Sequence, residues 1–216
     1  MPGSSSRPAP VWVIVVAAGR GSRFGGAKQY ADLAGRRVLD WSVDGARSVA
    51  DGVVLVVPPG RGEEPEPAVE AVVEGGDTRS ASVRAGLAAV PKHAEVVLVH
   101  DAARPLASHA LFRAVADAVI AGTDAAVPVV AVVDTICDER GTVVDREGLR
   151  AVQTPQGFRA RALRSVHAPG PEATDDATLV AANGGRLRLV LGDRWNLKVT
   201  EPADLVVAAA FLLEQG

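Results

Sequence analysis

Unbroken runs of apolar, mostly β-branched residues recur along the chain, with stretches of helical periodicity between them. Continuous apolar character, as opposed to alternation, is typical of strands that are buried on both faces of a parallel sheet. This order of elements predicts an α/β fold with a doubly wound, mostly parallel, Rossmann-like sheet. The apolar runs are residues 11–18, 52–58, 95–101 and 124–130, and the helical stretches are residues 38–50, 80–90 and 110–122.

The pattern changes between Asp134 and Val152. Two short apolar stretches flank the turn sequence "DERG" there, which predicts a β-hairpin. The segment has too little apolar content to form a core of its own, so we expect it to project from the body as an arm. After it we expect helices near 161–167 and 175–183, a strand over 186–191, and a closing helix over 202–214 capped by Thr200.

Composition supports layers of helices and sheet. Of the 216 residues, 48% are hydrophobic but only 4% are aromatic, so the core must consist of Val, Ala and Leu. We expect residues 11–216 to form a single domain, since domains usually have about 100–200 residues. Residues 1–10 are rich in Ser and Pro and lack the apolar segment of a signal peptide, which predicts a disordered lead. The loop 58–67, rich in Pro, Gly and Glu, is expected to be solvated and away from the motifs discussed below.

The charge balance gives no reason to expect a large anionic partner. A net charge of −3 provides no general attraction for nucleic acid or an anionic membrane, so neither is expected as a partner. No apolar run approaches the roughly 18 residues of a membrane span. Cys137 is the single cysteine, which excludes an intramolecular disulfide and a cysteine-based zinc cluster and is compatible with a cytoplasmic location.

The first strand leads into a glycine-rich loop, "VVAAGRGSRFGGAKQY". A dinucleotide fingerprint requires a third glycine where Phe24 stands. A P-loop requires lysine where Ala27 stands and Ser or Thr directly after it, but Lys28 and Gln29 follow instead. Both are excluded. Two interpretations remain: the backbone binds a phosphate with help from Arg23 and Lys28, or the loop lies on the surface and its glycines only turn the chain.

A second polar feature follows the third apolar run, in "VLVHDAARP". A buried strand ends at Asp101, and the carboxyl ends of neighbouring parallel strands meet at one edge of a sheet. The carboxylate could hold Mg²⁺ beside the first loop, or it could simply cap a helix. His100 would point to the opposite side of this strand, where a structural role is expected.

These motifs, taken together, resemble those of the 2-C-methyl-D-erythritol 4-phosphate cytidylyltransferase family of the non-mevalonate isoprenoid pathway. The resemblance extends from Val13 to the C-terminus. It rests on "AAGRGSRFGGAKQY", "GGDTRSASVRAGL", "VHDAARP", "VVDT", "VDREGL", "TPQGF", "TDDATL" and "NLKVTEPADL", in that order.

The resemblance implies a nucleotidyltransferase fold and a site for each substrate. It implies that CMP passes from CTP to methylerythritol phosphate with Mg²⁺, and that Asp101 holds the metal. The catalytic cations would be Arg23, Lys28 and Lys198. The cytidine pocket would consist of Ala17, Ala18, Gly19, Gly76, Asp77 and Ser82, and the acceptor site of Arg104, Thr154 and Thr174.

The resemblance also implies a homodimer in which the arm, residues 134–152, crosses to the partner. Thr135 and Arg146 would then complete the partner's acceptor site. One departure stands out, because only "FGGA" separates Arg23 from Lys28 and the loop must close by a short route. Three alternative functions stay open: a ribitol 5-phosphate cytidylyltransferase, a sugar-1-phosphate nucleotidyltransferase, or a nucleotide-binding module without catalytic activity.

Overall fold

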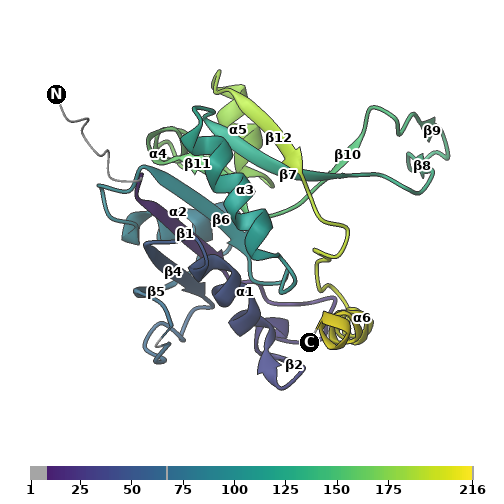
Figure 1. Cartoon of the computed structure of the whole chain (residues 1–216), viewed down its shortest axis with the longest axis horizontal. Coiled ribbons are helices and arrows are strands. Elements are labelled where there is room, and N and C mark those ends of the chain that lie inside the picture. Colours follow the sequence, from purple (N-terminus) through teal and green to yellow (C-terminus); the bar gives the residue numbers. More distant parts are fainter. Residues whose placement is uncertain (1–8, 67, 216) are drawn as a thin grey trace.

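The computed structural model describes residues 9–66 and 68–215, and an eight-stranded sheet runs through its centre (Figure 1). Seven strands follow one another in sheet order: β10 (Arg150–Val152), β7 (Ala125–Ala131), β11 (Gln156–Arg159), β6 (Val96–Asp101), β1 (Val11–Val16), β4 (Gly52–Val57) and β5 (Ala71–Glu74). The eighth strand, β12 (Leu187–Leu191), pairs with β7 on the edge opposite β10 and β11.

Helices cover both faces of this sheet, as the unbroken apolar runs predicted. On one face α1 (Val38–Arg47) and α3 (His109–Ile120) pack through Leu39 and Phe112 against alternate residues of β1, including Val13. On the other face Ile14 belongs to the apolar cluster that α2, α4 and α5 form with the sheet. These helices span Arg79–Ala89, Ala160–His167 and Asp176–Ala182. The α/β class and the mostly parallel sheet are therefore confirmed.

Four strands were not predicted: β11 and β5 of the central sheet, and the separate pair β2 (Asp32–Leu33) and β3 (Arg36–Arg37). β11 lies antiparallel between β6 and β7, so the sheet is mixed at that point. Its sequence, "QGFR", is short and carries no apolar run, and its pairing comes from neighbours distant in sequence. β5 follows the proline-rich loop and pairs parallel with β4. The short pair β2 and β3 is antiparallel and precedes α1.

The predicted hairpin is present and projects from the body of the molecule (Figure 1). β8 (Ile136–Cys137) pairs antiparallel with β9 (Val143–Val144), and the Asp138 carboxylate accepts hydrogen bonds from two backbone N–H groups of the turn. The predicted range is slightly too long, because residues 150–152 belong to β10 of the central sheet. From Val152 in β10 to Gly157 in β11 the chain advances five residues, while its partner β7 advances only three, from Val129 to Ala126. The resulting bulge contains the cis Thr154–Pro155 peptide bond.

The two ends of the described chain differ from prediction in detail. The expectation of disorder over residues 1–10 lies outside the described residues except at 9–10, where the Pro10 carbonyl accepts hydrogen bonds from the N–H groups of Glu95 and Val96. Helix α6 (Pro202–Gln215) closes the chain. Thr200 does not cap it, since the helix begins two residues later and Asp204 accepts the N–H groups of Thr200 and Glu201. Among the described residues, no helix combines the length and apolar character needed to span a bilayer.

Candidate active site

A cavity of about 580 Å³ lies at the carboxyl edge of the sheet, between the loops that follow β1 and β6 and the loop that precedes α2. This is the edge at which ligands bind in open α/β sheets. The cavity brings together ten of the predicted residues. They are Ala17, Ala18, Gly19, Arg23, Lys28, Gly76, Asp77, Ser82, Asp101 and Lys198.

The loop after β1 closes tightly around one carbonyl group. The Gly21 carbonyl accepts the N–H groups of Phe24, Gly25 and Gly26 at 3.0, 3.0 and 3.3 Å. Gly21 has a φ of +64°, and a Cβ atom there would lie 1.9 Å from the Gly26 carbonyl oxygen, so only glycine fits. A 3-10 turn, η1 (Lys28–Tyr30), follows immediately. The short spacer is thus accommodated by a turn, and Lys28 still reaches the cavity.

Unpaired backbone amides line the start of this loop. Within the described part of the chain, the N–H groups of residues 18–23 have no hydrogen-bond partner. Gly19 has open space around its α-carbon, so no side chain obstructs the backbone there. Successive free amides in a loop form an anion-binding concavity. The arrangement favours phosphate binding over a loop whose glycines only turn the chain.

Lys28 is a partly desolvated cation at this loop. Its Nζ donates to the Val199 carbonyl oxygen at 2.6 Å. Burial, with the nearby positive charges of Lys198 and Arg23, lowers the pKa of Lys28. Three cations that repel one another in a half-buried cavity are a favourable binding site for a polyanion, because the anion relieves that repulsion.

Asp101 is held by three contacts. Its carboxylate lies 2.7 Å from Lys198 Nζ through Oδ2 and 3.6 Å from Arg79 Nε through Oδ1, while its backbone N–H donates to Thr154 Oγ1 at 3.0 Å. Burial alone would raise the pKa of Asp101, but the positive charges of Lys198 and Arg79 lower it to about 2. The group is therefore an anion at any physiological pH, and Asp101 does not act as a simple helix cap.

The donor set suits a magnesium ion that the substrate helps to hold. Within the described residues no cluster of three His, Cys, Asp or Glu side chains forms a closed metal site. Mg²⁺ usually keeps several waters and binds through one or two carboxylates and substrate phosphates. The ionised Asp101 supplies one such carboxylate, and the free amides and cations beside it would hold the phosphates that complete the ligand set.

The predicted acceptor residues lie outside the cavity walls. Arg104 Nη1 donates to the Asn196 carbonyl at 2.7 Å and Nη2 to that of Val152 at 3.3 Å, so its guanidinium joins β10 to the loop before α6. Thr154 is buried, with its hydroxyl between the Asp101 N–H and His100 Nδ1. Thr174 is exposed before α5. Arg104 and Thr154 share a neighbour, because Asn196 accepts from Arg104 and donates to the Thr154 carbonyl, and none of the three residues lines the cavity.

Two further predicted residues lie on the arm. Thr135 and Arg146 are exposed, and Arg146 Nη1 donates to the Val133 carbonyl. Neither lines the cavity of its own chain. His100, in contrast, behaves as predicted for a structural residue. It is fully buried against Phe112, with ring centroids 4.9 Å apart, and burial lowers its pKa to about 4.

The sequence interpretation missed Arg79 and the loop 58–66. Arg79 begins α2, lines the cavity, and pairs with both Asp101 and Asp176. Its position one residue after the Thr78 cap of a helix was the available signal. Pro58 and Pro59 also line the cavity, which corrects the expectation that their loop lies away from the motifs. The Arg61 guanidinium of this loop lies 4.4 Å from the Tyr30 ring centroid.

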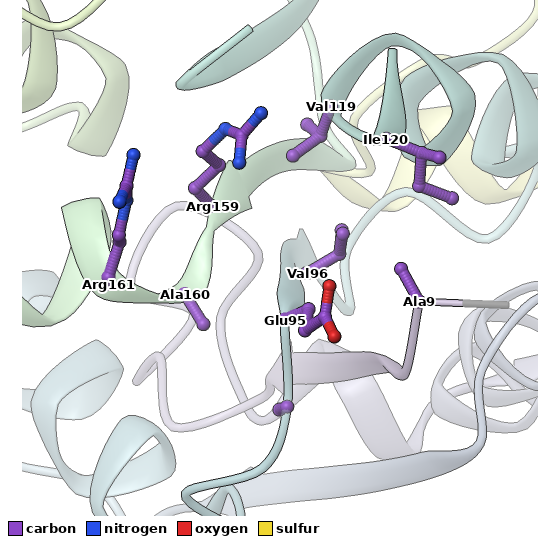
Figure 2. A pocket seen from close by; sticks show the side chains of 9 residues that line it. Ala9, Glu95, Val96, Val119, Ile120, Arg159, Ala160 and Arg161 are labelled. Carbon is purple, nitrogen blue, oxygen red and sulfur yellow. The ribbon is translucent and has the colours of Figure 1, made fainter. Parts of the chain in front are cut away.

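A second, smaller hollow of about 270 Å³ lies where β6 begins, at the other end of that strand (Figure 2). Figure 2 shows the side chains of Arg159 and Arg161 on one side and those of Val119 and Ile120 on another. Arg159 Nε is 3.7 Å from Asp124 Oδ1. None of the predicted site residues lines this hollow, so we assign the chemistry to the larger cavity.

Comparison with known proteins gives a consistent family match. The family model described as 2-C-methyl-D-erythritol 4-phosphate cytidylyltransferase (IspD) matches residues 11–214. A protein of Rhodococcus jostii (strain RHA1) with that same name is 44% identical over 220 residues, which cover 96% of this chain and 96% of that protein.

Solved structures agree in fold. The 2-C-methyl-D-erythritol 4-phosphate cytidylyltransferase from Thermus thermophilus superimposes with a TM-score of 0.82 at 42% identity, covering 94% of this chain and 98% of that one. The 4-diphosphocytidyl-2C-methyl-D-erythritol synthase from Anaerococcus prevotii gives a TM-score of 0.80 at 27% identity, covering 96% of this chain and 100% of that one.

Proposed function

The chain belongs to the 2-C-methyl-D-erythritol 4-phosphate cytidylyltransferase family, and from this premise we propose how its residues transfer CMP from CTP to 2-C-methyl-D-erythritol 4-phosphate. The products are 4-diphosphocytidyl-2-C-methyl-D-erythritol and pyrophosphate. One observation carries the assignment of roles: free amides, the cations of Arg23, Lys28 and Lys198, and the ionised carboxylate of Asp101 converge on the cavity at the carboxyl edge of the sheet.

CTP occupies that cavity. The cytidine lies against the small residues Ala17, Ala18 and Gly19 and against the loop that carries Gly76, Asp77 and Ser82. This loop approaches α2 closely, since a Cβ atom on Gly76 would lie 2.5 Å from the Ala81 Cβ. The triphosphate lies along the amides of residues 18–23, with Arg23 and Lys28 beside it.

The acceptor phosphate is the nucleophile. The second pKa of a phosphate monoester is about 6, so the group is largely a dianion at neutral pH and needs no general base. One of its oxygens attacks the α-phosphorus of CTP in line, the new P–O bond forms, and the bond to the β-phosphate oxygen breaks to release pyrophosphate. Arg23, Lys28 and Lys198 stabilise the negative charge that the α-phosphate carries in the transition state.

Asp101 would hold Mg²⁺ together with the phosphates of CTP. When bound, the ion neutralises phosphate charge and brings the two polyanionic substrates together. In the structure Lys198 Nζ donates to Asp101 Oδ2, and with a metal held by that carboxylate the lysine ammonium would turn to the phosphates. The Arg79 contact on the other carboxylate oxygen remains.

A homodimer completes the acceptor site. The arm exposes the apolar side chains of Val133, Val143 and Val144, with Leu149 at its base, and such a surface favours burial against another chain. Arg146 and Thr135 on that arm supply a further cation and hydroxyl for the acceptor phosphate, and neither residue lines the cavity of its own chain. Arg104, Thr154 and Thr174 form the acceptor site with them, and Arg104 connects the base of the arm to the loop that carries Lys198.

The acceptor is tested by direct competition. Purified protein with CTP and Mg²⁺ is given methylerythritol 4-phosphate or ribitol 5-phosphate, and pyrophosphate release is measured. We expect kcat/KM to be higher for methylerythritol phosphate by at least about tenfold, which corresponds to the net free energy of about one hydrogen bond. Equal or faster turnover of the pentitol phosphate would contradict the assignment, and no pyrophosphate with either acceptor would indicate a binding module.

A further inference from the structure

A buried carboxylate lies behind the cavity without an explanation in the reaction described above. Asp176 is the first residue of α5, and its side chain is 1% exposed. It does not cap the helix, because Asp175 does so by accepting the Thr178 N–H at 3.0 Å. A buried carboxylate is costly unless it is paired, so its partners indicate its role.

Those partners lead directly to the cavity. Asp176 Oδ2 accepts a hydrogen bond of 2.6 Å from Arg79 Nη1, and its Oδ1 lies 2.9 Å from Nε2 of the buried His167. The same Arg79 approaches Asp101 Oδ1 through Nε at 3.6 Å. The contacts run from His167 in α4, through Asp176 in α5 and Arg79 in α2, to Asp101 at the end of β6.

The guanidinium geometry is essential to this bridge. A planar guanidinium presents its Nε and Nη donors in a rigid fork and can bind two carboxylates at once, whereas an ammonium is a point charge on a flexible stem. Lys198 already occupies Oδ2 of Asp101. Arg79 forms an ion pair with the other oxygen, Oδ1, and this contact would keep the carboxylate in place when Lys198 turns to the phosphates.

We propose that Asp176 and His167 are positioning residues that hold Arg79 where it orients the Asp101 carboxylate towards the reacting phosphates. This inference rests on the function proposed above. The contacts that it requires are internal to one chain, unlike those of the acceptor site. Asp176 itself does not line the cavity and acts only through Arg79.

Asp176→Asn tests the proposal, because it keeps the size of the side chain and removes the charge that anchors Arg79. We expect kcat to fall by about tenfold or more, as for other residues that orient a metal ligand. Combining it with Arg79→Lys should give no further loss beyond Arg79→Lys alone. As a readout without turnover, Mn²⁺ binding to the CTP-loaded protein, measured by calorimetry without acceptor, should weaken by a similar factor.

Glu66→Gln is the matched control. Glu66 is also a nearly buried carboxylate, 9% exposed, that binds an arginine, Arg37, through both oxygens at 2.8 Å, but this pair lies outside the cavity. Loss of the Glu66–Arg37 ion pair should lower Tm and leave kcat and Mn²⁺ binding unchanged. If Asp176→Asn behaves the same way, or if its effect multiplies with that of Arg79→Lys, Asp176 is structural and the proposal is wrong.

Two results separate this proposal from the function itself. If Asp176→Asn does not fold, the Arg79→Lys variant alone tests the proposal, since its lysine still gives Asp176 a positive partner. Unchanged kcat and Mn²⁺ binding in Arg79→Lys would then overturn the proposal. If wild-type protein releases no pyrophosphate with CTP and methylerythritol phosphate, the proposed function fails first. Mn²⁺ binding to the CTP-loaded protein still tests the Asp176–Arg79–Asp101 contacts in that event.

Discussion

The cavity and the arm carry predicted residues of the same reaction, yet they are built in opposite ways. At the cavity, Asp101 is tied to Lys198, Arg79 and Thr154, and Lys28 is tied to Val199. On the arm, Thr135 and Arg146 are exposed, and the hairpin contacts chiefly itself. Charged side chains need fixed partners to hold their geometry. The cavity has them within one chain, whereas we propose that the arm finds them on a second copy.

The largest expected effect comes from the cavity. Lys28→Ala should lower kcat by about 10²–10³-fold, because it removes one preorganised cation from the charge that develops on the α-phosphate. Tm should change little, since the side chain makes one hydrogen bond, to a carbonyl. Steady-state pyrophosphate release and a thermal melt measure both. Lys92→Ala, at an exposed lysine, is the control; equal rates in the two variants would show that Lys28 is misassigned.

The second effect tests whether the arm serves another chain. Arg146→Ala should raise KM for the acceptor more than KM for CTP, while Arg140→Ala on the same hairpin should change neither. Assayed at an acceptor concentration well below the KM of Arg146→Ala, an equal mixture of Arg146→Ala and Lys28→Ala chains should regain about one quarter of wild-type activity after subunit exchange, because half of the dimers are mixed and each has one intact site. If the mixture stays as inactive as its components, the site is not shared.

A third, smaller effect tests the loop that connects Arg23 and Lys28, the two cations that we propose to be catalytic. Gly21→Ala should reduce kcat on the order of tenfold, since the new Cβ would displace the Gly26 carbonyl and with it Lys28. Gly26→Ala is the control, because Gly26 lacks a positive φ and its Cβ would meet no atom within 4 Å. Similar kcat values for both variants would mean that the turn around Gly21 does not place Lys28.

The prediction with the smallest effect on activity concerns stability and its dependence on pH through His100. Burial lowers the pKa of His100 to about 4, so between pH 6.5 and 4 the unfolded chain binds a proton that the folded chain does not. The free energy of unfolding should therefore fall as pH falls through this window, by up to about 3 kcal/mol. Urea titrations at several pH values measure it, and His100→Gln should remove that part of the slope.

Asp101 contributes little to the pH dependence of stability in the range used for His100. Its pKa is lowered to about 2 because the charges of Lys198 and Arg79 outweigh the opposing effect of burial. A lowered carboxyl pKa contributes stability that is present above the ordinary value near 4 and is lost as pH falls towards 2. If His100→Gln keeps the full slope between pH 6.5 and 4.5, another group is responsible and His100 is not held neutral.

Much of the fold and part of the site follow from local patterns. The strands β1, β4, β6 and β7 match unbroken apolar runs, because a strand buried on both faces must be apolar throughout. Asp101 and the loop after β1 were predicted together, since the carboxyl ends of neighbouring parallel strands meet at one edge. Strand β11 was not predicted, because the pairing of a short polar strand depends on its neighbours. The cap of α6 was not predicted correctly, because the choice between Thr200 and Asp204 also depends on surrounding contacts.

The sequence alone determined which chemistry is present: the α/β layers, the projecting arm, two excluded glycine-loop types, and the cations and carboxylate of a nucleotidyltransferase. Tertiary structure decided which of these groups meet. It brought Arg79 and Asp176, 97 residues apart, into a 2.6 Å contact behind Asp101, and it kept Arg146 away from the cavity of its own chain. Ion pairs of this kind depend on distances between helices packed on a sheet, and such distances leave no periodic pattern along the chain.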